Sequence, residues 1–136
     1  MTREEKFIHW KSYAERDLDA AQAMFETGRW FYVLFMCQQA LEKLIKGIYN
    51  LYVDDDVPRT HNIVMLANRV EDSVDIVFDE DKYRLFRMLS KYYIADRYPD
   101  FMSEAFALAE KEEAERMLFE TKEVFAWLLT LKPLED

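Results

Sequence analysis

Apolar residues recur at intervals of three and four positions along most of this chain, a spacing typical of helices that bury one face. The first such stripe extends from Phe7 to Phe25, and a denser one follows through residues 30–52. In the second segment the polar side chains form one strip, which consists of Gln38, Gln39, Glu42, Lys43, Lys46 and Asn50. The other positions are apolar on most sides, so we expect residues 30–52 to form the central helix of a bundle.

Capping residues and glycines set the limits of the first two helices. Thr2 and Glu5 form a capping-box pattern at the start of the first helix, and Gly28 is suited to end it. Gly47 lies inside the second helix, where glycine costs about 1 kcal/mol relative to alanine. This position therefore predicts the close approach of a neighbouring helix.

The second half of the chain predicts one short helix and two longer ones. Thr60 can cap a short helix over residues 61–70, and a longer helix is expected from about Glu80 to Ile94. Pro99 prevents that helix from continuing, and Ser103 is suited to cap a last helix that ends near residue 131. Its expected core stripe is Ala107, Ala114, Leu118, Thr121, Phe125 and Leu128. The elements together predict an all-α fold in a single domain over residues 1–136, an up-and-down four-helix bundle with an additional short helix.

Composition favours the same fold class. Of 136 residues 51% are hydrophobic, and only 2 glycines and 3 prolines are available for tight turns. The single cysteine, Cys37, lies in an apolar run, which predicts a buried thiol and no intramolecular disulfide.

Net charge and hydropathy exclude two classes of partner. The formal charge of −9 argues against non-specific nucleic-acid binding, which depends on neutralisation of phosphates by lysine and arginine. The first residues are charged and lack the apolar stretch of a signal peptide. The longest apolar run, residues 30–37, is far shorter than the roughly 20 residues that span a bilayer. We therefore expect a cytoplasmic protein with no membrane segment.

The charge reverses locally between residues 82 and 98, where cations gather beside aromatic rings. Arg84, Arg87 and Lys91 share one helix face, and the candidate ligand-binding residues are Arg87, Lys91, Arg97, Tyr93 and Tyr98, together with Lys43 of the central helix. Cations that form charge-assisted hydrogen bonds, next to rings that stack on a base, are what a nucleotide site requires. The same spacing is also typical of a solvated helix face, on which Glu80 would pair with Arg84 four residues later.

Polar residues of the central helix raise a similar choice. Gln39 and Lys43 lie one turn apart beside apolar positions, so they are expected to be partly buried and to need partners. Asp17 of the first helix is one candidate partner, and Lys43 serves either in a structural network or in a site. Glu42 and Lys46 are expected to pair along the surface, for only about 0.3–0.5 kcal/mol.

No motif predicts catalysis. His61 is expected to bond the loop at the start of the short helix, and His9 is expected at the boundary of the first. The chain contains no recognisable arrangement of nucleophile, base and orienting residue. The three aspartates at 54–56 lack the ligand pattern and turn glycine of a calcium loop, and no glycine-rich phosphate loop occurs. We therefore expect neither a metal nor a cofactor.

Five segments, in their order along the chain, resemble the small stand-alone members of the HEPN (higher eukaryotes and prokaryotes nucleotide-binding) superfamily. They are WKSYAERDLDAAQAMFETGRW, FYVLFMCQQALEKLIKGIY, PRTHNIVML, YYIADRYPDF and SEAFALAE. The resemblance implies a four-helix bundle with an additional short helix, which is often dimeric. It also implies a minimal nucleotidyltransferase as partner in a toxin–antitoxin or nucleotide-handling module. Many members are metal-independent ribonucleases that use an arginine and a histidine separated by four to six residues.

This chain departs from that ribonuclease pattern. After Arg97 the positions at which the histidine should fall are Met102, Ser103 and Glu104. Arg3 and His9 satisfy the spacing, but at the beginning of the first helix, so we interpret this match as coincidence. Without a histidine at the expected place, RNA cleavage lacks its obvious proton carrier.

The resemblance therefore favours a non-catalytic protein that binds a nucleotide or polyphosphate. Arg97 would contact phosphate, Arg87 and Lys91 would support it, and Tyr93 or Tyr98 would stack on the ligand. One alternative is a ribonuclease with a divergent active site that uses Arg97 and His61. The other is a structural module whose basic helix docks onto an acidic partner.

Overall fold

The computed structural model describes residues 1–131, except for the side chains of residues 95 and 96, and its regular elements are all helices. They are α1 (Arg3–Glu26), α2 (Trp30–Tyr52), α3 (Ile63–Glu71), α4 (Glu80–Arg97), α5 (Pro99–Leu108) and α6 (Lys111–Leu128). The all-α prediction is confirmed. None of these helices combines the length and the apolar character needed to cross a membrane.

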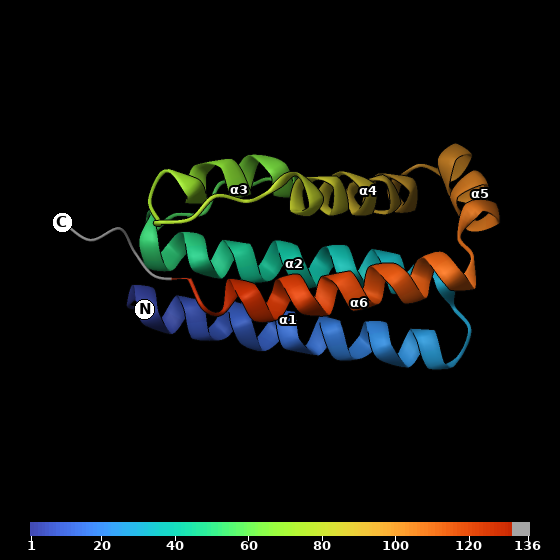
Figure 1. Cartoon of the computed structure of the whole chain (residues 1–136), viewed down its shortest axis with the longest axis horizontal. Coiled ribbons are helices and arrows are strands. Elements are labelled where there is room, and N and C mark those ends of the chain that lie inside the picture. Colours follow the sequence, from blue (N-terminus) through green and yellow to red (C-terminus); the bar gives the residue numbers. More distant parts are fainter. Residues whose placement is uncertain (132–136) are drawn as a thin grey trace.

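The long helices run up and down around α2 (Figure 1). α1 and α2 form an antiparallel pair, and α6 lies along both. α3 and α4 lie roughly end to end in one layer over α2, while α5 sits across the far end of the bundle. The predicted bundle is therefore confirmed, and α4 carries the basic segment along its outer layer.

The first two helices begin, end and pack as their sequence predicts. The Thr2 hydroxyl accepts from the Glu5 backbone N–H, and the Glu5 carboxylate accepts from the Thr2 N–H, which completes the capping box. Gly28 takes a positive φ of 77°, a conformation that glycine adopts without strain. A Cβ added at Gly47 would lie 2.9 Å from the Cβ of Trp10, so α1 does approach α2 closely there.

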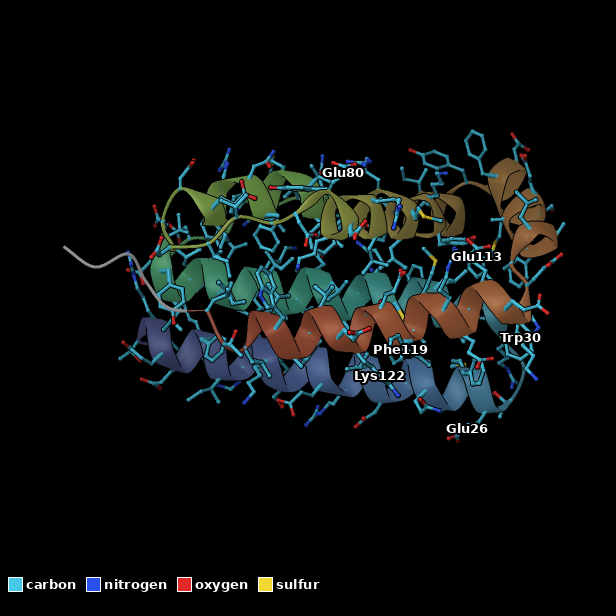
Figure 2. All side chains as sticks on the ribbon, viewed as in Figure 1. Glu26, Trp30, Glu80, Glu113, Phe119 and Lys122 are labelled. Atoms are coloured by element: carbon cyan, nitrogen blue, oxygen red, sulfur yellow. The ribbon has the colours of Figure 1, made fainter. Side chains whose placement is uncertain are left out.

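The core is centred on α2, and side chains fill the space between the helices (Figure 2). Leu34, Leu41 and Leu44 of α2 are fully buried and belong to one cluster with Phe86 of α4 and Met117 of α6. The prediction of a central helix is thus confirmed. Cys37 is also buried in this cluster, and its burial raises the pKa of the thiol to about 12.

Two predicted caps are wrong. Asn62, rather than Thr60, caps α3, because its side-chain oxygen accepts from the Met65 backbone N–H at 3.1 Å. Thr60 instead accepts from the N–H of Asn62 at 3.1 Å, one step earlier in the chain. Ser103 caps no helix, because it lies inside α5, which begins at Pro99.

The predicted last helix is two helices. The backbone is extended at Ala109 and Glu110, which separates α5 from α6. Ala107 therefore lies in α5, where it is exposed, whereas Ala114 and the later members of the predicted stripe are buried in α6. The fourth helix is also longer than expected and ends at Arg97, immediately before the tyrosine whose backbone Pro99 restrains.

Candidate functional site

A buried row of polar side chains lies on one face of α2. Gln38, Glu42 and Lys46 follow each other at four-residue spacing and are at most 8% exposed. The Glu42 carboxylate accepts from Gln38 Nε2 and from Lys46 Nζ, each at 3.0 Å. The predicted pairing of Glu42 with Lys46 is present, but its placement on the surface is wrong. His61, in the loop before α3, contacts Gln38 and Glu42, while Lys46 Nζ lies 5.7 Å from the ring centre of Trp10 in α1, so groups from other elements cover this face.

His61 is anchored on that buried carboxylate. Its Nδ1 lies 3.1 Å from both oxygens of Glu42, while the side chain is 48% exposed. Because an ionised carboxylate only accepts hydrogen bonds, Nδ1 carries the proton and Nε2 is left for a different partner. The expectation that His61 bonds its own loop is therefore wrong. Its ring is oriented by α2, in the way that a carboxylate orients a functional histidine.

Tyr93 joins His61 to the basic end of α4. The two rings stack with centroids 4.5 Å apart, and Phe35 of α2 lies parallel to Tyr93 at 6.2 Å. The Arg97 Cζ atom lies 4.9 Å from the centre of the Tyr93 ring, and Arg97 is exposed. Tyr93 and Arg97 are one helical turn apart, so α4 itself sets their spacing. His61 and Arg97, which are far apart in the sequence, thus contact the same tyrosine ring.

A hollow of about 520 Å³ opens beside these rings, between the start of α3 and the middle of α4. It is lined by His61, Asn62, Val64, Arg87, Ser90, Tyr93 and Ile94. Ser90 donates its hydroxyl proton to the Phe86 carbonyl at 2.8 Å, so toward the hollow it offers lone pairs. Arg87 is half exposed, and its guanidinium pairs with Glu80 at the beginning of α4. The hollow therefore combines apolar walls and two aromatic rings with a few polar groups, as small-ligand sites do.

The structure places only some of the predicted ligand residues at this hollow. Arg87 and Tyr93 line it, and Arg97 contacts Tyr93. Lys91 is exposed on the same helix but does not line the hollow. Tyr98 is exposed beyond the end of α4, where its ring packs edge-on against Phe101.

Lys43 lies on a different side of α2. Its Nζ lies 2.6 Å from a carboxylate oxygen of Asp17, which confirms Asp17 of α1 as the partner. The pairs within α4 also differ from the prediction, because Arg84 pairs with Asp81 and leaves Glu80 to Arg87. Lys43 is therefore an α1–α2 bridge and is not brought to the hollow.

Several residues of this site carried only a weak sequence signal. Glu42 and Gln38 were visible as polar residues in an apolar helix, but their four-residue spacing does not say which element covers them. Asn62 and Ser90 follow no motif, and only the packing of α3 beside α4 brings them to one hollow.

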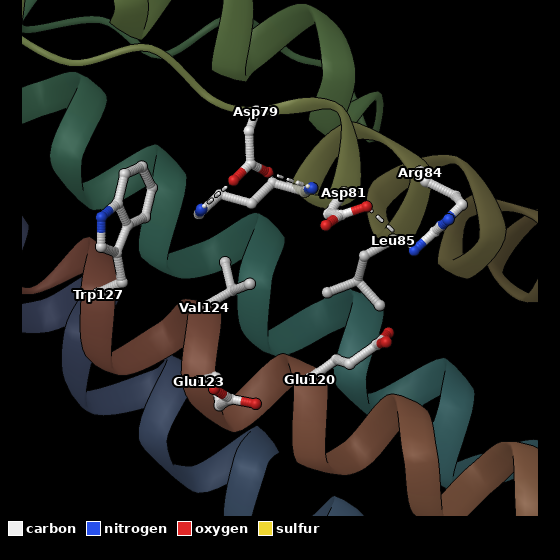
Figure 3. A pocket seen from close by; sticks show the side chains of 9 residues that line it. Asp79, Asp81, Arg84, Leu85, Glu120, Glu123, Val124 and Trp127 are labelled. Carbon is white, nitrogen blue, oxygen red and sulfur yellow. Dashed lines mark hydrogen bonds and ion pairs between the residues drawn. The ribbon is translucent and has the colours of Figure 1, made fainter.

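A second hollow of about 400 Å³ lies between the start of α4 and the end of α6 (Figure 3). The Lys82 Nζ sits 4.3 Å from the centre of the Trp127 ring and pairs with Asp79 at 3.1 Å. Arg84 pairs with Asp81 at 3.2 Å on the same side. Within the described residues its acidic groups do not form a cluster able to hold a metal ion. Its cations are thus engaged by neighbouring carboxylates, and its lining contains one aromatic ring, Trp127, where the first hollow has the stacked pair of His61 and Tyr93.

Comparison with known proteins identifies the family. Two solved structures are similar over 94% of this chain. TT1696 from Thermus thermophilus has 28% sequence identity, a TM-score of 0.77 and 97% of its own chain covered. ST0689, described as an archaeal HEPN homologue, has 24% identity, a TM-score of 0.67 and 96% of its chain covered, and shows the shared fold. No curated protein matches the sequence. The sequence model of the HEPN domain matches residues 8–131, so this chain belongs to the HEPN domain family.

Proposed function

We propose that this HEPN protein binds a nucleotide at the surface formed by His61, Arg87, Tyr93 and Arg97. The observation that carries the proposal is that two stacked rings line an open hollow, and that one of them, Tyr93, also contacts the exposed guanidinium of Arg97. The apolar walls of the hollow suit a base. Arg97 can keep its plane on the Tyr93 ring while its N–H groups donate to a phosphate. The role proposed for the protein is binding rather than catalysis.

The proposal extends to assembly. Membership of the HEPN family supports a cytoplasmic homodimer that partners a minimal nucleotidyltransferase in a toxin–antitoxin-like module. Under this proposal Lys91 and Tyr98, which are exposed outside the hollow, contact a longer ligand or the partner. Sedimentation of the chain alone, and mixed with a nucleotidyltransferase encoded beside it, distinguishes a monomer, a homodimer and a mixed complex.

Arg97→Ala tests the binding proposal. A hydrogen bond to a charged group contributes about 1.5–3 kcal/mol, so the substitution should weaken ATP and GTP binding roughly 10- to 100-fold. Isothermal titration calorimetry measures both affinities. Arg84→Ala is the matched control, because Arg84 is an exposed arginine of the same helix that lines the other hollow. We expect that control to change affinity less than about twofold. Equal affinities for wild type and Arg97→Ala would show that Arg97 does not contact the nucleotide.

A second candidate function, metal-independent RNA cleavage, is favoured by the anchoring of His61 on Glu42. With Nδ1 held by the carboxylate, Nε2 is free to exchange a proton with a substrate near Arg97. Under this hypothesis the fold supplies the arginine–histidine pair that the sequence spacing lacks.

His61→Ala separates the two candidates. If His61 carries a proton, the substitution should slow cleavage of a single-stranded RNA in EDTA by about 100-fold or more, the usual contribution of an acid–base residue. His9→Ala is the control, because His9 is the other histidine of the chain and is exposed on α1. RNA that stays intact at high wild-type concentration would eliminate the ribonuclease candidate and leave nucleotide binding in place.

A further inference from the structure

The positive charge of Arg87 is already engaged at the hollow. Its guanidinium Nη2 pairs with Oε1 of Glu80. Glu80, which is labelled in Figure 2, lies two helical turns earlier at the start of α4. Seven residues of α-helix rise by about 10.5 Å, so the two side chains must extend toward each other along the helix. Arg87 is therefore directed toward the beginning of α4, although it lines the hollow.

This pairing lowers the charge that the site can offer to an anion. Arg97 presents a full positive charge over the Tyr93 ring, whereas Arg87 and Glu80 together are neutral. One phosphate charge is matched by Arg97. Any additional phosphate charge must compete with Glu80 for the guanidinium of Arg87. It is also repelled by the negative charge of the Glu80 carboxylate. The side chains of Arg87 and Glu80 are 52% and 77% exposed, so water and salt keep this competition modest.

We infer that Glu80 is a specificity-determining residue, which competes with ligand phosphates for Arg87 and selects against highly charged phosphate groups. The inference rests on the proposed nucleotide site. The effect of Glu80 on binding should grow with the charge of the ligand. From a monophosphate to a triphosphate, both the attraction to Arg87 that Glu80 blocks and the direct repulsion by the Glu80 carboxylate increase. Removing the carboxylate should therefore strengthen binding, the opposite of what loss of a ligand residue would do.

Glu80→Gln, titrated with AMP and with ATP in low salt, tests this. We expect ATP to bind about two- to fivefold more tightly to the variant, and AMP to gain less. Asp81→Asn is the matched control. Both carboxylates lie in the first turn of α4, so both substitutions remove one negative charge and the same favourable interaction with the helix dipole. Asp81, however, pairs with Arg84 at the other hollow (Figure 3), so its loss should change ATP affinity by less than about 1.5-fold.

Arg87→Gln completes a double-mutant cycle. If Glu80 acts through Arg87, Glu80→Gln should strengthen ATP binding much less in the Arg87→Gln background than it does in the wild type. Equal gains from Glu80→Gln and Asp81→Asn, or a full Glu80→Gln gain that persists without Arg87, would overturn the inference. Circular dichroism of each variant confirms that the bundle is intact. If wild-type protein binds neither nucleotide, the proposed function itself fails, whereas binding without a Glu80-specific gain refutes only the role of Glu80.

Discussion

Glu42 shows how one buried side chain can organise a surface that it does not reach. Its carboxylate is 3% exposed and receives hydrogen bonds from Gln38, Lys46 and His61. A buried charge is tolerated only when its lone pairs are satisfied, so these partners are fixed relative to one another. The half-exposed imidazole of His61 is thereby held rigidly against Tyr93. The orientation of the candidate site is thus set one layer below the surface.

At the scale of single residues, sequence reasoning worked where a side chain's own neighbours decide its environment. Cys37 lies in an apolar run and is buried, and Lys43 lies beside an apolar face and pairs with Asp17. It failed for Glu42 and Lys46, because helical periodicity defines a face without saying what covers it. Here a loop distant in the sequence returns over that face and brings His61 with it.

Helix limits were predictable where a capping side chain or a glycine marks them. The Thr2 capping box and the positive φ of Gly28 set both ends of α1. The break between α5 and α6 was missed because the extended residues are Ala109 and Glu110, neither of which is a helix breaker. Tertiary packing therefore decides this break, and the sequence periodicity does not reveal it.

Gly47→Ala tests the contact between α1 and α2. Helix propensity alone would favour alanine by about 1 kcal/mol. The new Cβ, however, would lie 2.9 Å from Trp10 Cβ and 3.2 Å from Phe7 Cδ2, so α1 must shift. Overpacking costs about 1–3 kcal/mol, so after the propensity gain we expect a net destabilisation of up to about 2 kcal/mol, measured by urea denaturation.

Ser12→Ala is the control for this substitution. Ser12 is exposed on α1, so alanine there gains propensity without a clash and should stabilise by a few tenths of a kcal/mol. A Gly47→Ala variant that is more stable than wild type would show that α1 yields at no cost, and that the close approach does not restrict residue 47.

At the scale of the whole molecule, the contacts between helices contain weakly acidic side chains, two tyrosines and a cysteine. The fold keeps these side chains protonated. Tyr92 of α4 donates to Glu113 of α6 at 3.3 Å, and burial with this carboxylate raises the pKa of its phenol to about 12. Tyr83 of α4 donates to Glu71 of α3 at 2.6 Å, and the same two causes raise its pKa further. Together with the buried thiol of Cys37, these groups make the bundle less stable as the pH rises above their unfolded-state pKa values.

The free energy of unfolding should therefore fall steeply in alkali. Below pH 10 tyrosine is neutral in both states, so the contribution of Tyr92 is fully present. Between about pH 10 and 12 the unfolded chain loses this proton while the folded chain retains it, which favours unfolding by about 2–3 kcal/mol.

Urea denaturation at a series of pH values, on wild type and Tyr92→Phe, measures the effect. Tyr92→Phe should lose less stability across this interval, although it begins about 1 kcal/mol lower because its hydrogen bond is gone. Tyr13→Phe, which removes a hydroxyl from an exposed ring, should follow the wild-type slope. A Tyr92→Phe curve as steep as that of wild type would show that the contact between α4 and α6 is not sensitive to this ionisation.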